Sequence, residues 1–223
     1  MIVPRFPIKA AIFDVDGTLL DSTDAWTGVG IKYLLNKGIP AETIQSDLDE
    51  VLDQMSLEEG AVYMQEHYGI TDSVEEIRAG FLAVIDKFYR EEAQLKPGMQ
   101  QLLQNLADSD VTMMLCTTSG EELVLAALER CGVKDYFDGI ITTEGTTTSK
   151  HEPYMYLTCA EAMEAKPRET LVFEDVFFAL QTAKAAGFRT VGVEDDKSAS
   201  DKEAIKAISN YYLEKDFYKN YEV

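Results

Sequence analysis

Short apolar segments alternate along the chain with longer segments in which apolar residues recur at helical spacing. The short segments predict buried strands, because brief apolar runs bounded by turn residues are typical of a parallel sheet. Five such strands are predicted, at residues 8–13, 111–116, 139–142, 170–173 and 189–193. Helices are predicted at residues 98–108, 121–131, 153–164, 177–186 and 201–209. This alternation predicts an α/β fold, in which a doubly wound parallel sheet carries helices on both faces.

Between residues 21 and 95 only helical spacing is found. We expect four helices there, at about residues 22–38, 41–54, 56–68 and 73–93. A helix-only stretch after the first strand predicts a separate small bundle, and Lys96-Pro97-Gly98 marks the return to the sheet. The expected division is a core domain of residues 1–20 and 96–223 with an inserted helical domain of residues 21–95. No element is predicted from Tyr211 onward.

The composition limits the classes of partner. With 223 residues, 46% of them hydrophobic, the chain has enough apolar side chains for a large core. Its 40 acidic and 20 basic residues give a net charge of −20, which argues against binding to nucleic acid or to an anionic membrane surface. Because a phosphorylated substrate would also be repelled, a phosphate site would require a cation and a lysine that reverse the local field.

The cysteines indicate a reducing compartment. Cys116, Cys131 and Cys159 lie in apolar surroundings without metal-ligand spacing, so we expect reduced thiols in a cytoplasmic protein. The N-terminal segment is too short and too rich in proline for a signal peptide. No apolar run approaches the roughly 18 residues of a membrane-spanning helix. We expect a monomer or a weak dimer, since nothing in the sequence requires more.

Two carboxylates follow the first predicted strand. Asp14 and Asp16 are separated by one residue, and Gly17 then allows a tight turn. Ligands of open α/β sheets bind at the carboxyl ends of strands, and alternation places both side chains on one side if the backbone stays extended. Two close carboxylates repel each other unless a cation or a shared proton intervenes, and Mg²⁺ prefers such oxygen ligands. A solvated turn with capping aspartates is the alternative.

Two further strand ends carry polar residues. Thr117 and Thr118, followed by Ser119-Gly120, offer hydroxyl and backbone N–H groups to a phosphate, or alternatively form a plain helix N-cap. Lys150 precedes a helix, where a cation is electrostatically misplaced unless it faces an anion. A solvated surface lysine is the alternative interpretation.

A second acidic pair, Glu174-Asp175, ends the strand predicted at residues 170–173. If this strand lies beside the first strand, four carboxylates converge, and such a cluster requires a cation. An acidic pair at a helix N-terminus is the simpler alternative.

Together these residues resemble the four motifs of the haloacid dehalogenase superfamily. The resemblance rests on Asp14-Val15-Asp16-Gly17-Thr18, Thr117, Lys150 and Glu174-Asp175, in this order and spacing. It covers residues 8–210, and the helical insert is similar to the C1 cap domain of the family. The resemblance implies a Rossmann-like core with an inserted cap. It is strongest for the phosphoglycolate phosphatase and β-phosphoglucomutase-like group.

The resemblance also implies roles for the acidic residues. Asp14 would be the nucleophile that forms an aspartyl-phosphate, and Asp16 would act first as general acid and then as general base. Mg²⁺ would be held by Asp14, by the backbone carbonyl of Asp16 and by Asp175. Glu174 would act mainly through water.

Phosphate binding is the second implied task. The Thr117 hydroxyl and backbone groups of Thr118 and Gly17 would bind phosphate oxygens. Lys150 would neutralise charge on the phosphate and on Asp14. This distribution suits phosphoryl transfer, which depends on positioning and on charge neutralisation.

Some positions depart from the family pattern. Val176 stands where many relatives have a serine that supports the metal ligands, and Ala179 stands where they have glycine. His151 separates Lys150 from the next proline, and we expect it at the surface. Trp26 is a candidate for the substrate pocket, with packing inside the helical domain as the favoured alternative.

The leading functional prediction is a Mg²⁺-dependent phosphatase that hydrolyses a small phosphorylated metabolite. A β-phosphoglucomutase-like sugar phosphomutase is the first alternative, although residues 22–32 lack the His or Arg expected in its cap. A catalytically inactive binding protein on the same scaffold is the second alternative, supported only by Val176 and Ala179.

Overall fold

The computed structural model describes residues 7–22, 28–52, 54–143 and 148–221. The chain forms two compact units, of which the first comprises Met1–Asp21 with Gln94–Val223 and the second Ser22–Ala93. The expected boundaries differ from these by one or two residues. The reason is a small antiparallel sheet of the first unit, in which β2 (Leu20–Asp21) pairs with β3 (Gln94–Leu95).

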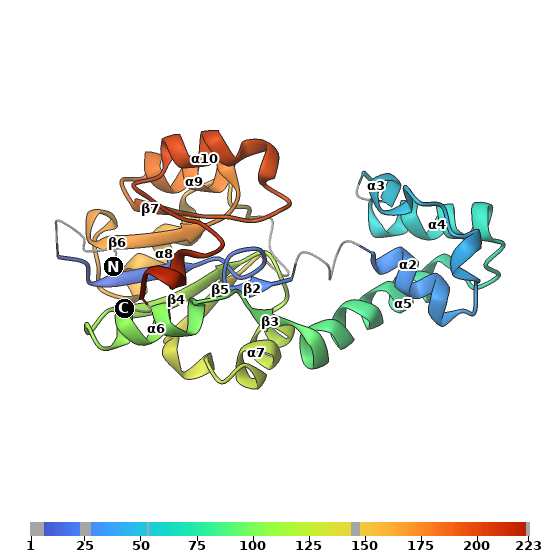
Figure 1. The fold of residues 1–223 in the computed structure, drawn as a ribbon, viewed down its shortest axis with the longest axis horizontal. Helices are drawn as coiled ribbons and strands as arrows, with labels where there is room; N and C mark the ends of the chain where they lie inside the picture. Colours follow the sequence, from blue (N-terminus) through green and yellow to red (C-terminus); the bar gives the residue numbers. More distant parts are fainter. Residues whose placement is uncertain (1–6, 23–27, 53, 144–147, 222–223) are drawn as a thin grey trace. The chain divides into compact units, whose positions relative to one another are not determined.

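The first unit is built on a six-stranded parallel sheet in the order β5-β4-β1-β6-β7-β8 (Figure 1). The strands are β1 (Ala10–Phe13), β4 (Thr112–Thr117), β5 (Gly139–Thr142), β6 (Thr170–Glu174), β7 (Arg189–Val193) and β8 (Tyr211–Leu213). From β1 the chain first winds outward through β4 and β5, and then returns to the other side of β1. The carboxyl ends of β1, β4 and β6 therefore meet at the switch point of the sheet, where ligands of such folds bind.

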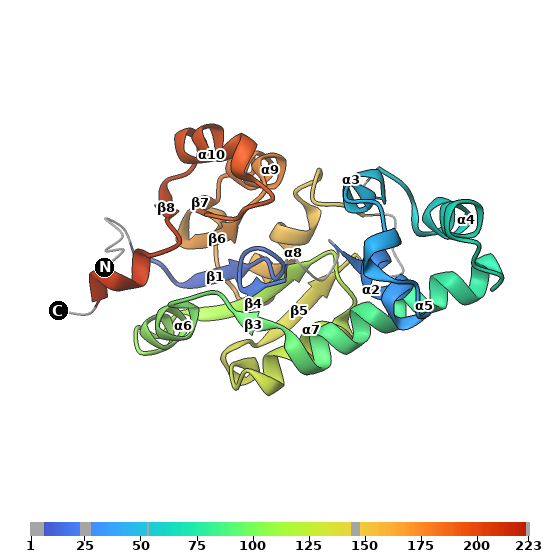
Figure 2. The ribbon, with the colours of Figure 1, turned by 45° about the vertical axis from the view of Figure 1, so that its right-hand side comes forward.

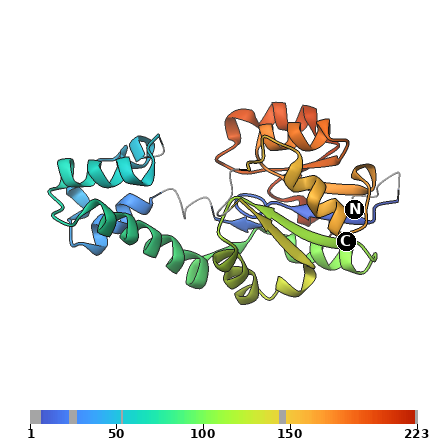
Figure 3. The ribbon, with the colours of Figure 1, turned by 180° about the vertical axis from the view of Figure 1, so that it is seen from behind.

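Helices cover both faces of this sheet. They are α6 (Met99–Ala107), α7 (Glu121–Arg130), α8 (Tyr154–Ala162), α9 (Phe177–Ala185) and α10 (Lys202–Ile208), with short η turns at Lys134–Tyr136, Pro167–Glu169, Ala199–Asp201 and Phe217–Tyr221. Right-handed crossovers place α6 and α7 on one face and α8 to α10 on the other, as Figure 1 and the reverse view in Figure 3 show. The predicted doubly wound α/β fold is confirmed.

The central strands are buried on both faces, so they form a fixed platform for the loops at their ends. Every residue of β1 is fully buried, and the Phe13 ring stacks on the Phe173 ring of β6 with 4.2 Å between centroids. On the α8 face, Ile12 and Val172 belong to a core cluster that includes Tyr156. Each large apolar side chain buried in this way contributes roughly 1.5–3 kcal/mol.

The sequence did not predict the sixth strand. β8 is only three residues long and pairs along one side with β7, through Val191–Val193. Its sequence, Tyr-Tyr-Leu, has no long apolar run, because an edge strand needs burial on fewer sides than a central one. The two-residue strands β2 and β3 were also missed, since two residues are too few to show a period.

The second unit consists of helices (Figure 2). They are α2 (Val29–Asn36), η1 (Ala41–Thr43), α3 (Leu48–Leu52), α4 (Leu57–Tyr68), α5 (Val74–Lys87) and a π-helical turn, η2 (Phe88–Glu92). Capping boxes start α4 at Ser56 and α5 at Ser73, where each serine exchanges hydrogen bonds with a glutamate three residues later. The core of the unit includes the Tyr33 and Phe81 rings, in edge-to-face contact at 5.1 Å.

Two helix predictions in this unit need comment. The helix predicted at residues 41–54 is wrong as a continuous element, because η1 and α3 are separate. The backbone at Ile44 is extended. The backbone N–H of Gln45 donates to the Tyr68 hydroxyl oxygen at 3.1 Å, and the Gln45 side chain accepts from the Tyr63 hydroxyl, so this residue packs on α4 and does not continue a helix. The predicted start of the first helix, at residues 22–24, extends outside the described residues.

Candidate active site

The loop that follows β1 turns sharply after its first aspartate. Asp14 extends the β1–β6 ladder by one bond, from its N–H to the Phe173 carbonyl at 3.0 Å. The N–H groups of Leu19 and Leu20 then both return to the Val15 carbonyl. Extended backbone, which was the condition for aligning Asp14 with Asp16, therefore ends near Val15, where the chain begins to turn.

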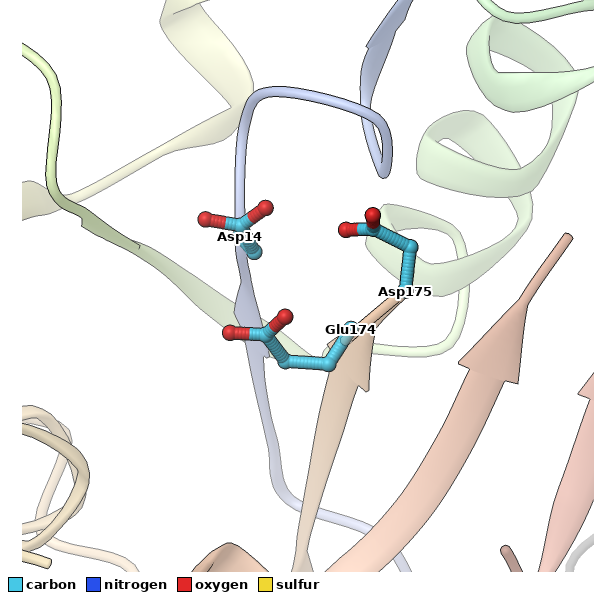
Figure 4. Close-up of side chains that lie close together, drawn as sticks. All are labelled: Asp14, Glu174 and Asp175. Carbon is cyan, nitrogen blue, oxygen red and sulfur yellow. The ribbon is translucent and has the colours of Figure 1, made fainter. Parts of the chain in front are cut away.

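Three carboxylates gather where β1 and β6 end. Ligand atoms of Asp14, Glu174 and Asp175 all lie within 4.8 Å of one another, and all three residues are buried. Figure 4 shows the carboxylates of the three side chains facing a common space. The predicted neighbourhood of the two strands is confirmed, with Phe13 paired to Phe173. Three of the four expected carboxylates converge, and Asp16 is not part of this group.

A lysine and a tyrosine contact the same group. Lys150 reaches it from the loop before α8, and its ammonium contacts Asp14 Oδ1 and lies 2.6 Å from Glu174 Oε1. The Tyr156 hydroxyl, from the first turn of α8, donates to the same Glu174 oxygen at 3.0 Å. Lys150 is only 6% exposed, so the structure excludes the alternative of a solvated surface lysine.

Burial and mutual repulsion dominate the electrostatics of this group. Burial raises the pKa of Asp14 well above its usual range, and Lys150 opposes this shift while Glu174 and Asp175 add to it. The pKa of Asp175 rises to about 7, first through burial and then through the charge of Glu174. Burial disfavours the charged form of Lys150, yet Asp14 and Glu174 outweigh this effect and raise its pKa. One lysine thus faces three carboxylates, so their full ionisation would leave excess negative charge, which the raised pKa values of Asp14 and Asp175 reflect.

Asp16 occupies a separate position beside the loop after β4. Its Oδ2 accepts a hydrogen bond from the Ser119 hydroxyl at 2.5 Å. Ser119 is itself buried, and its backbone N–H donates to the Thr117 hydroxyl oxygen at 3.0 Å. The structure thus brings the second aspartate together with the predicted phosphate-binding loop.

That loop is fastened from β5. Thr117 is fully buried at the end of β4, whereas Thr118 is exposed. The Thr142 hydroxyl donates to the Ser119 carbonyl at 2.7 Å, and the Thr143 hydroxyl donates to the Thr118 carbonyl at 3.3 Å. These two hydrogen bonds restrain the backbone of the loop at Thr118 and Ser119.

Both oxygens of Asp175 are held by hydroxyls. Thr18 donates to Oδ1 at 2.9 Å, and Ser198 donates to Oδ2 at 3.3 Å. Val176, which stands at the serine position of many relatives, is the N-cap residue of α9, and its side chain has no hydrogen-bonding group. Ala179 is fully buried one turn into that helix. In place of a serine at position 176, the hydroxyls of Thr18 and Ser198, from two other loops, hold the Asp175 carboxylate.

The donor set fits a hard divalent cation. Glu174 Oε2 is buried and has no hydrogen-bond partner among the residues that the structure describes, although an unpaired buried carboxylate oxygen is costly. Gly17, with φ of +79°, leaves room for Asp175, because a Cβ there would lie 2.7 Å from Asp175 Oδ2. Oxygen ligands and excess negative charge are what Mg²⁺ and similar ions require. These features match a divalent-metal site made by Asp14, Glu174 and Asp175.

Other singled-out residues lie outside this centre. His151 is exposed as expected, and its ring stacks on Phe178 at 4.0 Å. Trp26 lies outside the described residues. Cys116 and Cys159 are buried free thiols, as predicted for core positions, while Cys131 is partly exposed. No helix in the described part of the chain is long and apolar enough to cross a membrane.

The sequence did not point to Tyr156 or Ser198, which contact the carboxylates of this centre. Tyr156 lies in an apolar helix and looks like a core aromatic, and Ser198 lies in a polar stretch. Thr18 was part of the first motif, but no role was assigned to it. None of these residues has a spacing that would reveal its contact across the fold.

A family model described as haloacid dehalogenase-like hydrolase matches residues 11–193. The chain belongs to this family. The resemblance inferred from the motifs is thereby confirmed, and the matched span includes every residue of the acidic centre and the lysine beside it.

Curated relatives in the haloacid dehalogenase-like family are named as phosphatases. The chain is 24% identical over 184 residues to the phosphorylated carbohydrates phosphatase of Thermotoga maritima, covering 82% of this chain and 84% of that protein. It is 25% identical over 205 residues to hexitol phosphatase B of Escherichia coli, covering 90% of each. Among solved structures, a Thermotoga maritima protein proposed to be a β-phosphoglucomutase superposes with a TM-score of 0.80 at 23% identity, over 96% of this chain and 98% of that one.

Proposed function

We propose that the protein is a divalent-metal-dependent phosphatase that hydrolyses a small phosphorylated metabolite through an aspartyl-phosphate on Asp14. The observation that carries this proposal is the convergence of Asp14, Glu174 and Asp175 with Lys150 at the carboxyl ends of β1 and β6. A buried nucleophile, a buried cation and a donor set for a metal are the parts that phosphoryl transfer needs.

In the first half-reaction, a carboxylate oxygen of Asp14 attacks the phosphorus of the substrate. The bond between phosphorus and the ester oxygen breaks, and Asp16 gives its proton to the departing alcohol. Ser119 orients the Asp16 carboxyl for this transfer through its hydrogen bond to Oδ2. Lys150 offsets the negative charge of Asp14 and of the incoming phosphoryl group.

In the second half-reaction, water attacks the phosphorus of the aspartyl-phosphate. Asp16, now a carboxylate, accepts a proton from this water, and the bond between phosphorus and Asp14 breaks. Inorganic phosphate leaves, and Asp14 returns as a carboxylate. Thr117, Thr118 and Gly17 hold the phosphate oxygens through a hydroxyl and backbone groups during both steps.

The metal we propose is Mg²⁺. Asp14 and Asp175 would hold it together with the Asp16 backbone carbonyl, and Glu174 would act through water. When bound, the ion supplies positive charge that neutralises the phosphate and the crowded carboxylates. The fully buried and unpaired Glu174 Oε2 supports this assignment, since it lacks any other partner among the described residues.

We propose phosphorylated sugars or sugar alcohols as the substrate class. Two relatives with 24% and 25% identity are named for phosphorylated carbohydrates and for hexitols. We propose further that the second unit is the cap domain of the family and that its residues select the substrate. A cytoplasmic site of action would fit such a substrate.

Hydrolysis of p-nitrophenyl phosphate tests the proposal. We expect turnover by the wild type with MgCl₂, none after chelation with EDTA, and a loss of at least about 10³-fold in Asp14→Asn, which keeps the shape of the side chain. Lys202→Met is the matched control, because Lys202 pairs with Glu194 away from the three carboxylates. Absence of Mg²⁺-dependent turnover in folded wild-type protein, against this compound and a panel of sugar phosphates, would refute the proposal. Isomerisation of a sugar phosphate in place of its hydrolysis would identify a mutase.

A further inference from the structure

Lys96 is a nearly buried lysine that the proposed mechanism does not use. It follows β3 directly and is 9% exposed. Its ammonium lies 2.5 Å from the Gly17 carbonyl oxygen, 2.6 Å from the Glu194 carbonyl oxygen and 2.7 Å from Asp195 Oδ2. These three acceptors match the three N–H donors of an ammonium group, so the side chain is fixed in one position.

The acceptors belong to two different segments. Gly17 lies in the loop after β1, and Glu194 and Asp195 follow β7. Asp195 also shapes its own segment, because Oδ1 accepts the Lys197 backbone N–H at 2.9 Å. Lys96 therefore joins two loops that are far apart in the sequence and that meet at the carboxyl end of the sheet.

Each of these two loops ends on one oxygen of Asp175. The residue after Gly17, Thr18, donates to Asp175 Oδ1 at 2.9 Å. The residue after Lys197, Ser198, donates to Asp175 Oδ2 at 3.3 Å. A change in the position of either loop therefore changes how the Asp175 carboxylate is held.

We infer that Lys96 is a positioning residue of the metal site, which holds the Asp175 carboxylate in its ligating orientation through Thr18 on one side and Ser198 on the other. This inference rests on the proposed function. It accounts for the valine at position 176, since the hydroxyl support of Asp175 comes from the two loops that Lys96 joins. Partners of metal ligands typically change metal affinity about 10–100-fold when they are removed.

The charge of Lys96 explains why a neutral residue would not replace it. Asp195 is 6% exposed, and a buried carboxylate without its cation is costly. In Lys96→Met the two loop carbonyls and Asp195 lose their shared donor together. The segment 194–198 then loses the contact that joins it to the Gly17 loop, while its bonds to Lys202 and Lys215 remain.

Calorimetric titration with MgCl₂ tests the inference in three variants. We expect Lys96→Met to raise the Mg²⁺ dissociation constant about tenfold or more, and Ser198→Ala, which removes one long hydrogen bond, to raise it about threefold. Lys202→Met is the matched control, because this lysine pairs with Glu194 at 2.5 Å on the same segment without contacting Gly17. At saturating MgCl₂ the KM for p-nitrophenyl phosphate should stay within about twofold of the wild type in all three.

The double variant separates positioning from mere stability. If Lys96 acts through Ser198, the alanine substitution should add less than its single effect in the Lys96→Met background. Wild-type Mg²⁺ affinity in folded Lys96→Met, or equal weakening by Lys202→Met, would overturn the inference. If Lys96→Met does not fold, Ser198→Ala and Asp195→Asn decide, and wild-type affinity in both overturns it. A wild type that hydrolyses substrate without binding Mg²⁺ refutes the proposed function instead.

Discussion

A single methyl group added at Gly17 is expected to disturb the acidic centre. Gly17 has φ of +79°, and a Cβ at this position would lie 2.7 Å from Oδ2 and 3.0 Å from Cγ of Asp175. Contacts this short do not persist, so the loop or the carboxylate must move. The carboxylate is restrained, because Thr18 and Ser198 hold its two oxygens. In Gly17→Ala, therefore, either the loop changes its conformation or Asp175, a proposed metal ligand, is displaced.

Two costs add in this variant. The left-handed backbone costs alanine about 1 kcal/mol, and the forced contact in a packed site costs about 1–3 kcal/mol more. We expect the free energy of unfolding of the first unit to fall by about 2–4 kcal/mol. Gly132→Ala is the matched control, since Gly132 has φ of +70° in the same unit and, apart from its chain neighbours, no described residue lies within 4 Å of its added Cβ. This control carries the backbone cost alone, about 1 kcal/mol.

Denaturant unfolding and Mg²⁺ titration measure both parts of the effect. A shift of Asp175 by about 1 Å is expected to lower kcat/KM about 100-fold and to weaken Mg²⁺ binding, while Gly132→Ala keeps the wild-type values of both. The reasoning is refuted if Gly17→Ala has the same free energy of unfolding as Gly132→Ala and the same Mg²⁺ affinity as the wild type.

Three further predictions concern single side chains. Lys150→Met leaves two buried carboxylates without their cation, so the free energy of unfolding in EDTA should fall by about 3–5 kcal/mol, and by less in MgCl₂. The kcat should fall about 10²–10³-fold. An equal loss of stability in both buffers contradicts the metal assignment. Tyr156→Phe removes a donor to Glu174 and should cost about 1 kcal/mol of stability by denaturant titration, whereas Tyr154→Phe, at an exposed position on the same helix, should cost almost nothing. Burial, followed by the hydrogen bond to Asp72, raises the pKa of Tyr33 to about 12, above its unfolded value of about 10; this contribution to stability is present below pH 10 and is lost between about pH 10 and 12, and unfolding curves of Tyr33→Phe should lack that loss.

Much of the sheet could be predicted from the sequence, because its central strands are buried on both faces. The predicted bounds of β5, at residues 139–142, and of β7, at residues 189–193, agree with the structure. A central strand such as β7 is packed from both faces, so most of its residues are apolar and leave a continuous signal. The edge strand β5 is only partly buried, but its Ile140-Ile141 pair still marks it as a strand. The edge strand β8 and the pair β2–β3 leave no such signal, since short or one-sided pairing places few demands on composition.

The acidic centre was predictable for a different reason. Asp14 and Asp175 directly follow apolar strands, and Glu174 is the last residue of β6. A parallel sheet brings such strand ends together. The orientation of Asp16 was not predictable, because it depends on a turn that begins at Val15 and on a hydrogen bond from another loop. Lys96 was missed for the same reason. Its partners are separated from it by 79 residues on one side and by about 100 on the other, so only the folded chain reveals them.

The paired strands β2 and β3 have a consequence for the chain as a whole. They bring Asp21 and Gln94 opposite each other, at the two points where the chain enters and leaves the second unit. An insertion whose ends are already hydrogen-bonded adds little closure entropy to the folding of its host. A short hairpin turn could replace residues 22–93 without breaking a strand of the large sheet, so this position accepts inserts of different length and sequence. If the insert selects the substrate as we propose, substrate choice can evolve there while the proposed catalytic residues of the first unit stay unchanged.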